Sequence, residues 1–214
     1  MPSIYYNRNF KSRYFYHIIN RGAYKKNIFK SKNDYQTFID ILSYYLLHPQ
    51  SRQFGYQKIV NKFKVRNLKE TVHLVSYCLM PNHFHLLLKQ LPSATNKTNI
   101  SNLMRRVMVT YAMYFQDKHK HAGAIFQGRY KNVVVDSNEQ LLHLSKYIHL
   151  NPQKLINKLT DYSYSSFPAF INQVITPNWL HPKYVLKLET NYKQYIMSPI
   201  NDEDANKIKS LTLE

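Results

Sequence analysis

The alternation of apolar and polar residues predicts a hairpin near the centre of the chain. Residues 72–80 are nearly all apolar or aromatic, which is typical of a buried strand. The pair Pro81-Asn82 suits the two central positions of a tight turn, and a second strand is expected at residues 83–88. Because side chains alternate along a strand, His83 and His85 should lie side by side on one face.

The other elements are expected on both sides of this hairpin. The pattern predicts a strand at residues 14–20, helices at 34–47 and 100–118, a strand or extended segment at 123–136, and a helix from Ser137 or Asn138 to Asn151. This order predicts an α+β sandwich with a central antiparallel sheet and helices on one face. The main domain is expected at 14–170. It would follow a basic arm at 1–13, contain a lysine-rich insertion at 48–70, and precede a partly helical tail at 171–214.

Charge points to the class of partner. The chain has 30 Lys and Arg against 12 Asp and Glu, a net charge of +18, with aromatic residues interleaved among the cations. Such an excess favours nucleic acid over a membrane surface, although a merely soluble basic surface is the alternative. The single cysteine, Cys78, excludes an intrachain disulfide. The sequence has no apolar run long enough for a signal peptide or a membrane span, so a cytoplasmic, nucleoid-associated protein is expected. A monomer or a homodimer is expected.

Two imidazoles on one face of a strand suggest a metal site that needs a third ligand. The alternative is a pair of core histidines satisfied by hydrogen bonds, because a chain with 10 histidines contains such spacings by chance. A second pair with the same spacing, His119 and His121, falls in a lysine-rich run, where a solvated basic loop is expected.

A further part of the site is expected at a tyrosine, the candidate nucleophile, that is followed four residues later by a side-chain amide. Of three such pairs, only Tyr147 with Asn151 falls on a predicted helix, where this spacing places both on one face. His143 lies one turn earlier on the same stripe. Tyr147 would then stand at the border of buried and exposed surface, as a nucleophile should, although a packed aromatic residue with a C-terminal Asn cap fits equally.

The ordered motifs resemble a known family. They are Tyr16-His17-Ile18-Ile19-Asn20-Arg21-Gly22, Tyr77 to Leu87, Phe126-Gln127-Gly128-Arg129-Tyr130-Lys131, Tyr147-Ile148-His149-Leu150-Asn151-Pro152, and Tyr164-Ser165-Ser166-Phe167. Together they resemble the single-tyrosine HUH transposases, in particular the REP-associated tyrosine transposases, over residues 14–170. The resemblance implies a ferredoxin-like catalytic domain with His83 and His85 as metal ligands and Tyr147 as nucleophile. Insertion-sequence relatives use Gln where this chain has Asn151, the expected third ligand.

The implied chemistry is cleavage and rejoining of single-stranded or hairpin DNA through a 5′-phosphotyrosine, with Mg²⁺ or Mn²⁺ as Lewis acid. A phenol ordinarily has a pKa near ~10, so a metal or a base must help Tyr147 lose its proton, and His143 is the candidate base. Side chains expected to contact DNA are Arg21, Arg105, Arg129 and Lys131 through the backbone, with Tyr130 or Phe126 stacking on a base.

Two other functions stay open. The chain could be a DNA- or RNA-binding descendant of the same fold whose active site is inactive, and it would then bind without forming covalent adducts. It could also be a metal-dependent hydrolase that uses water as the nucleophile, and cleavage would then survive Tyr147→Phe.

Overall fold

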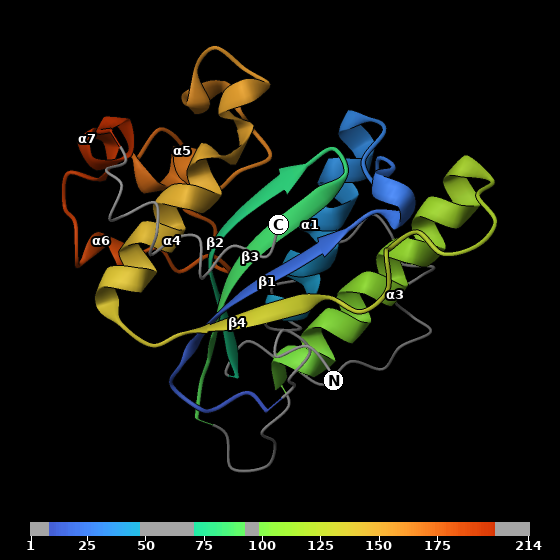
Figure 1. The fold of residues 1–214 in the computed structure, drawn as a ribbon, viewed down its shortest axis with the longest axis horizontal. Helices are drawn as coiled ribbons and strands as arrows, with labels where there is room; N and C mark the ends of the chain where they lie inside the picture. The colour runs from blue at the N-terminus through green and yellow to red at the C-terminus, as the bar shows by residue number, and fades with distance from the viewer. Residues whose placement is uncertain (1–8, 48–70, 93–98, 200–214) are drawn as a thin grey trace.

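The computed structural model describes residues 9–47, 71–92 and 99–199, and its centre is a four-stranded antiparallel sheet (Figure 1). The strands are β1 (Phe15–Arg21), β2 (Val72–Met80), β3 (His83–Gln90) and β4 (Lys131–Val135), in the order β2-β3-β1-β4. The predicted hairpin is confirmed, and β1 pairs with both β3 and β4. The expected extended segment at 123–136 forms a strand only in its second half.

The long helices match the apolar periodicity of the sequence. The long ones are α1 (Lys32–Leu46), α3 (Asn99–His119) and α4 (Asn138–Leu150), and the short ones are α5 (Phe167–Phe170), α6 (Lys183–Leu186) and α7 (Tyr192–Met197). Short 3₁₀ turns are η2 (Ala23–Lys25), η4 (Asn151–Lys154) and η5 (Leu159–Asp161). None of the helices in the described part of the chain has the length and hydropathy needed to span a bilayer.

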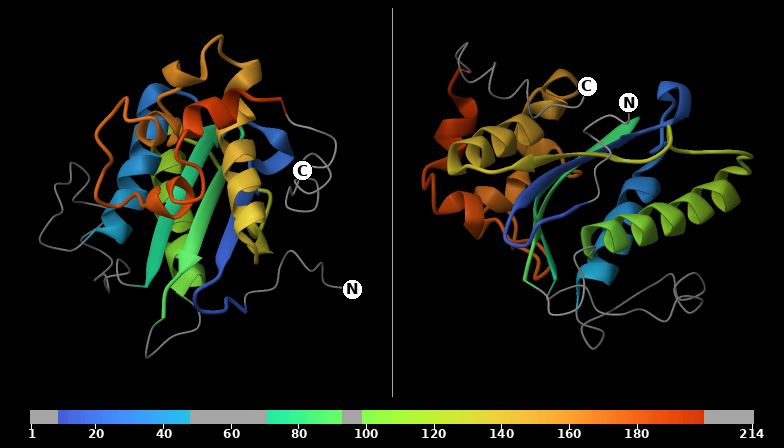
Figure 2. Two further views of the ribbon diagram at one scale, coloured as in Figure 1. Left: turned by 90° about the vertical axis from the view of Figure 1, so that its left-hand side faces the viewer. Right: turned by 60° about the horizontal axis from the view of Figure 1, so that its bottom comes forward.

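The α+β fold with an antiparallel sheet is confirmed, but helices cover both of its faces. On β3, Phe84, Leu86 and Leu88 pack with α1 and α3, whereas Leu87 faces a second core that includes α4, α5 and α7. Figure 2 shows these two layers on opposite sides of the sheet. The expectation of helices on one face was therefore wrong, because β2 and β3 are apolar on both faces and each face must be buried.

The packed fold extends beyond the residues expected to form it. Phe10, assigned to the arm, is buried and packs edge-to-face against Tyr16 with ring centroids 4.7 Å apart. Val185, Tyr192 and Ile196, assigned to the tail, are buried in the second core. The predicted insertion at 48–70 lies outside the described residues, as do 1–8 of the arm and 200–214 of the tail.

Candidate active site

The register of the sheet brings a third histidine to the predicted pair. His85 lies opposite Ile19 on β1, and the next residue of β1 on the same face is His17. The Nε2 atom of His17 lies 2.9 Å from Nδ1 of His85, and the two rings stack with centroids 5.2 Å apart. Both side chains are fully buried, so the contact is shielded from solvent.

Helix α4 crosses this face and places Tyr147 over the histidines. The centroid of its ring lies 5.5 Å from that of His85 and 6.3 Å from that of His17, nearly perpendicular to both. The helix begins at a Ser137 cap that accepts from the Gln140 backbone, and its stripe of Leu141, Leu144 and Ile148 enters the second core. Because one apolar stripe fixes the rotation of the helix, Tyr147 at its border faces the sheet.

A buried histidine fastens the end of α4 to the chain beyond residue 160. The ring nitrogens of His149 lie 2.8 Å from the Tyr192 hydroxyl and 2.7 Å from Oγ of Ser166. The Tyr192 hydroxyl also donates to Ser145. Complete burial lowers the pKa of His149 to about 3, so this imidazole is neutral at physiological pH. His149 therefore holds the turn that carries Tyr147 and takes no charge itself.

Both histidines of the hairpin are held through Nδ1. Nδ1 of His83 lies 2.6 Å from Oδ1 of Asn82, which can only accept, so His83 donates from Nδ1 and has its lone pair on Nε2. His85 takes the same tautomer when its Nδ1 donates to His17. Metal-binding histidines characteristically bind through one nitrogen while the other donates to a neighbour. The donor set therefore fits a metal bound through the two Nε2 atoms.

The third ligand is less well defined. Asn151 directly follows α4, and its amide nitrogen donates to the carbonyl oxygen of Tyr147 at 2.9 Å. Its amide oxygen is the atom that could bind a metal. Within residues 9–47, 71–92 and 99–199, no three His, Cys, Asp or Glu side chains form a metal-binding group. A metal here would consequently depend on two imidazoles and a neutral oxygen ligand.

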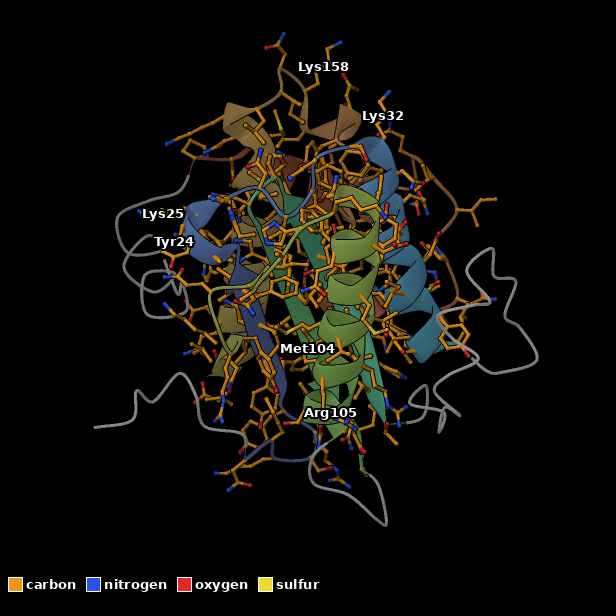
Figure 3. The ribbon with its side chains drawn as sticks, turned by 90° about the vertical axis from the view of Figure 1, so that its right-hand side faces the viewer. Tyr24, Lys25, Lys32, Met104, Arg105 and Lys158 are labelled. Carbon is orange, nitrogen blue, oxygen red and sulfur yellow. The ribbon has the colours of Figure 1, made fainter. Side chains whose placement is uncertain are left out.

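Two of the expected phosphate contacts lie on the histidine side of the sheet. Arg21 on β1 pairs with His83 on β3. Lys131 on β4 pairs with Ile19, and Ile19 is in turn the cross-strand partner of His85. Cross-strand partners point to the same face, so both cations border the site. Arg129 is exposed just before β4. Arg105 instead lies near the N-terminal end of α3, in the layer on the opposite face of the sheet (Figure 3).

Three other expected roles do not fit the structure. Phe126 and Tyr130 are buried in the first core, so they are not available to stack on a base. His143 has Nδ1 3.2 Å from the Tyr195 hydroxyl and Nε2 3.8 Å from Glu139, and these contacts direct it toward α7. The second histidine pair is not a solvated loop, since His119 ends α3 and contacts the buried carboxylate of Asp34.

His17 is the site residue that sequence reasoning missed. The quoted motif around Tyr16 contained it, but nothing local distinguishes it from the other histidines. The available signal was alternation: His17, Ile19 and Arg21 share a face of β1, and that face could have been matched to the face of His83 and His85 if the strand pairing had been known.

The chain is similar to known proteins in sequence and in fold. The model of the IS200-like transposases matches residues 10–151. The chain is similar to a solved REP-associated tyrosine transposase bound to a REP hairpin, with a TM-score of 0.53 and 16% identity, over 82% of this chain and 88% of that one. It is also similar to a putative transposase from Deinococcus radiodurans R1, with a TM-score of 0.37 and 18% identity, over 66% and 93% of the two chains. No curated protein matches the sequence.

Proposed function

Because the chain belongs to the IS200-like transposase family, we propose that it cleaves and rejoins single-stranded DNA with Tyr147 as the nucleophile. The observation that carries this proposal is the position of Tyr147, whose ring centroid lies 5.5 Å from that of His85 on the face shared with His17 and His83. The two tyrosines of α3 that were the nearest competitors in the sequence are poorly placed. Tyr111 and Tyr114 are buried in the first core, beyond the sheet, and bond to Ile28 and Asp34.

In the proposed reaction the Tyr147 oxygen attacks the scissile phosphorus as the bond from phosphorus to the 3′ oxygen breaks. The phenol loses its proton, and the leaving 3′ oxygen gains one. The product pair is a 5′-phosphotyrosine and a free 3′-hydroxyl, so one phosphodiester is exchanged for another. The same steps in reverse, with a different 3′-hydroxyl, rejoin the strand. Helix α4 holds the nucleophile against the sheet and so supplies the orientation that the attack requires.

A divalent metal bound by His83, His85 and the Asn151 oxygen would supply Lewis-acid polarisation of a non-bridging phosphate oxygen. Mg²⁺ prefers oxygen ligands, so a site with two imidazoles would suit Mn²⁺ at least as well. The residues around the metal ligands have their own task in this proposal. Asn82 and His17 hold the two rings through Nδ1 and limit their rotation, and the Asn82 oxygen also fixes the tautomer of His83.

The charge distribution supports DNA as the partner. Arg21, Arg129 and Lys131 lie in or next to the strands that carry the site, in a chain with a net charge of +18. A solved protein of similar fold is bound to a REP hairpin, which favours a hairpin with single-stranded flanks as the substrate. The nucleophile Tyr147 and the expected metal ligands His83, His85 and Asn151 come together within one chain, so a monomer would suffice for cleavage.

The deciding experiment compares Tyr147→Phe with Tyr195→Phe, which removes a hydroxyl from the same layer of the fold. Each protein is incubated with labelled single-stranded DNA from the flanks of its gene and with Mn²⁺ or Mg²⁺. The wild type and Tyr195→Phe should form a denaturation-resistant adduct, and the DNA-linked peptide should contain Lys146-Tyr147-Ile148. Tyr147→Phe should bind DNA without forming the adduct.

The same experiment separates the alternatives. Cleavage that continues in Tyr147→Phe would indicate a hydrolase with water as nucleophile. Binding by the wild type with no adduct under either metal would indicate an inactive descendant. Mixing His83→Ala with Tyr147→Phe tests whether a monomer suffices for cleavage, because an adduct restored by the mixture would require a site shared between two chains.

A further inference from the structure

The loop after β1 presents an aromatic side chain to solvent. Tyr24 in η2 is 90% exposed, whereas Tyr14, at the other end of β1, is 38% exposed. Lys25 and Lys26 follow it and are also exposed. Figure 3 shows Tyr24 and Lys25 at the outer edge of this loop. The Tyr24 ring therefore adds almost nothing to the burial that stabilises the fold.

The backbone at this position is one that tyrosine disfavours. Tyr24 has a φ of 54° and Lys25 a φ of 59°, both in the left-handed region, where glycine and asparagine are the common residues. The turn is also tightly closed, because a Cβ at Gly22 would lie 2.0 Å from the carbonyl oxygen of Lys26. A bulky exposed ring in such a conformation suggests selection for a property other than stability.

The loop is fastened to the turn of the histidine hairpin. The Gly22 backbone donates to the carbonyl oxygen of Asn82 at 2.8 Å, and the amide nitrogen of Asn82 donates to the carbonyl oxygen of Lys25 at 3.2 Å. The Ile28 backbone donates to Pro81 at 2.8 Å. Asn82 is also the residue that holds Nδ1 of His83. One residue thus links the loop that carries Tyr24 to a proposed metal ligand.

We propose that Tyr24 stacks on an unpaired base of the bound DNA strand, beside the cleavage site. This inference rests on the proposed function, which supplies single-stranded DNA as the ligand. Exposed aromatic rings next to cations bind single strands in this way, because every base offers a face for stacking and every phosphate a charge. Lys25 and Lys26 contact the neighbouring phosphates, and Tyr24 takes the role that the buried Phe126 and Tyr130 are unable to fill.

The test uses Tyr24→Asn, Tyr24→Phe and, as a matched control, Tyr14→Asn. Binding is measured without metal to a single-stranded oligonucleotide from the gene flanks that carries 2-aminopurine, and to a blunt duplex of the same sequence. Asparagine removes the ring but suits the left-handed backbone, so Tm should stay unchanged or rise by about 2–4 °C. Weaker binding by a variant that is at least as stable as the wild type would not be due to unfolding.

Stacking on one base predicts that Tyr24→Asn weakens single-strand binding about 5- to 100-fold and abolishes quenching of 2-aminopurine. Tyr24→Phe and Tyr14→Asn should bind as the wild type does, and duplex binding should not change. Equal losses for single strand and duplex would overturn the proposal, since a duplex offers no splayed base. Wild-type affinity in Tyr24→Asn, with the Tyr147 adduct intact in the parent protein, would overturn this inference alone. Failure of the parent to bind single strands would overturn both.

Discussion

The molecule contains two histidine pairs with the same spacing, and the structure gives them different surroundings. His83 and His85 lie on β3, where residues two apart point to the same face, and the centroids of their rings are 4.9 Å apart. His119 and His121 lie at and just beyond the end of α3, where no such alternation applies. His119 contacts Asp34 at 3.1 Å, beside Lys118, whose ammonium lies 2.7 Å from the same carboxylate.

The partners of each pair decide what it can do. His83 and His85 contact Asn82 and His17, respectively, through Nδ1. That arrangement favours a metal at Nε2. His119 instead contacts the buried carboxylate of Asp34. This carboxylate also accepts hydrogen bonds from the backbone of Lys30 and Ser31, and so caps the N-terminus of α1. The spacing of two histidines therefore says little about their function, whereas the secondary structure in which they lie says much.

The largest expected effect is on cleavage. His83→Ala or His85→Ala should reduce adduct formation below detection, because each removes one of few ligands from the proposed metal site. The double variant His119→Ala with His121→Ala should keep most of the activity. Adduct formation with Mn²⁺ is the measurement. If the double variant loses the adduct while His83→Ala retains it, the roles of the two pairs are reversed.

The next effect concerns the groups that hold the two rings. Asn82→Ala and His17→Ala should each weaken Mn²⁺ binding by about 10- to 100-fold, the usual effect of removing a partner of a metal ligand. Calorimetric titration with Mn²⁺ measures this without DNA. His17→Gln should recover part of the affinity, because its amide can still accept from Nδ1 of His85. Unchanged Mn²⁺ affinity in both alanine variants would show that the Nδ1 contacts serve packing only.

The second pair should respond to acid through Asp34. Burial raises the pKa of this carboxyl, but hydrogen bonds from Lys118, the Lys30 backbone, Tyr114 and His119 outweigh it and lower the pKa from 3.8 to about 2. The ionised carboxylate then contributes about 2 kcal/mol to the free energy of unfolding. This contribution is complete above pH ~4 and is lost as the pH falls through about 2.

Urea unfolding of the wild type and Asp34→Asn at pH 5 and pH 2.5 measures this contribution. The difference in free energy of unfolding between the two proteins should shrink at the lower pH. A difference that is equal at both pH values would show that Asp34 stabilises the fold by something other than its charge.

The smallest effect is expected for His121 alone. Its ring is half-buried and lies 5.7 Å from that of Phe115. His121→Ala should change the free energy of unfolding by less than about 0.5 kcal/mol, as is usual for substitutions near the surface. The same urea unfolding at pH 7 measures it, and a loss above 1.5 kcal/mol would indicate that the second pair acts as a unit.

Local patterns in the sequence determined much of this protein. Period-two alternation predicted the hairpin and placed His83 and His85 on one face, and helical periodicity placed Tyr147 one turn before Asn151. The ordered motifs identified the family. The hairpin and the two placements depend on residues close together in the chain, where geometry repeats every two or 3.6 residues.

Only the tertiary structure decided the rest. His17 reaches His85 across 68 residues of sequence because β1 pairs with β3 in one register. Part of the expected tail belongs to the fold because its apolar side chains pack into the second core. Tertiary packing also buries Phe126 and Tyr130 and leaves Tyr24 exposed. Strand pairing and burial depend on which distant surfaces meet, and the free energy of that choice is shared over the whole core, so no single stretch of sequence records it.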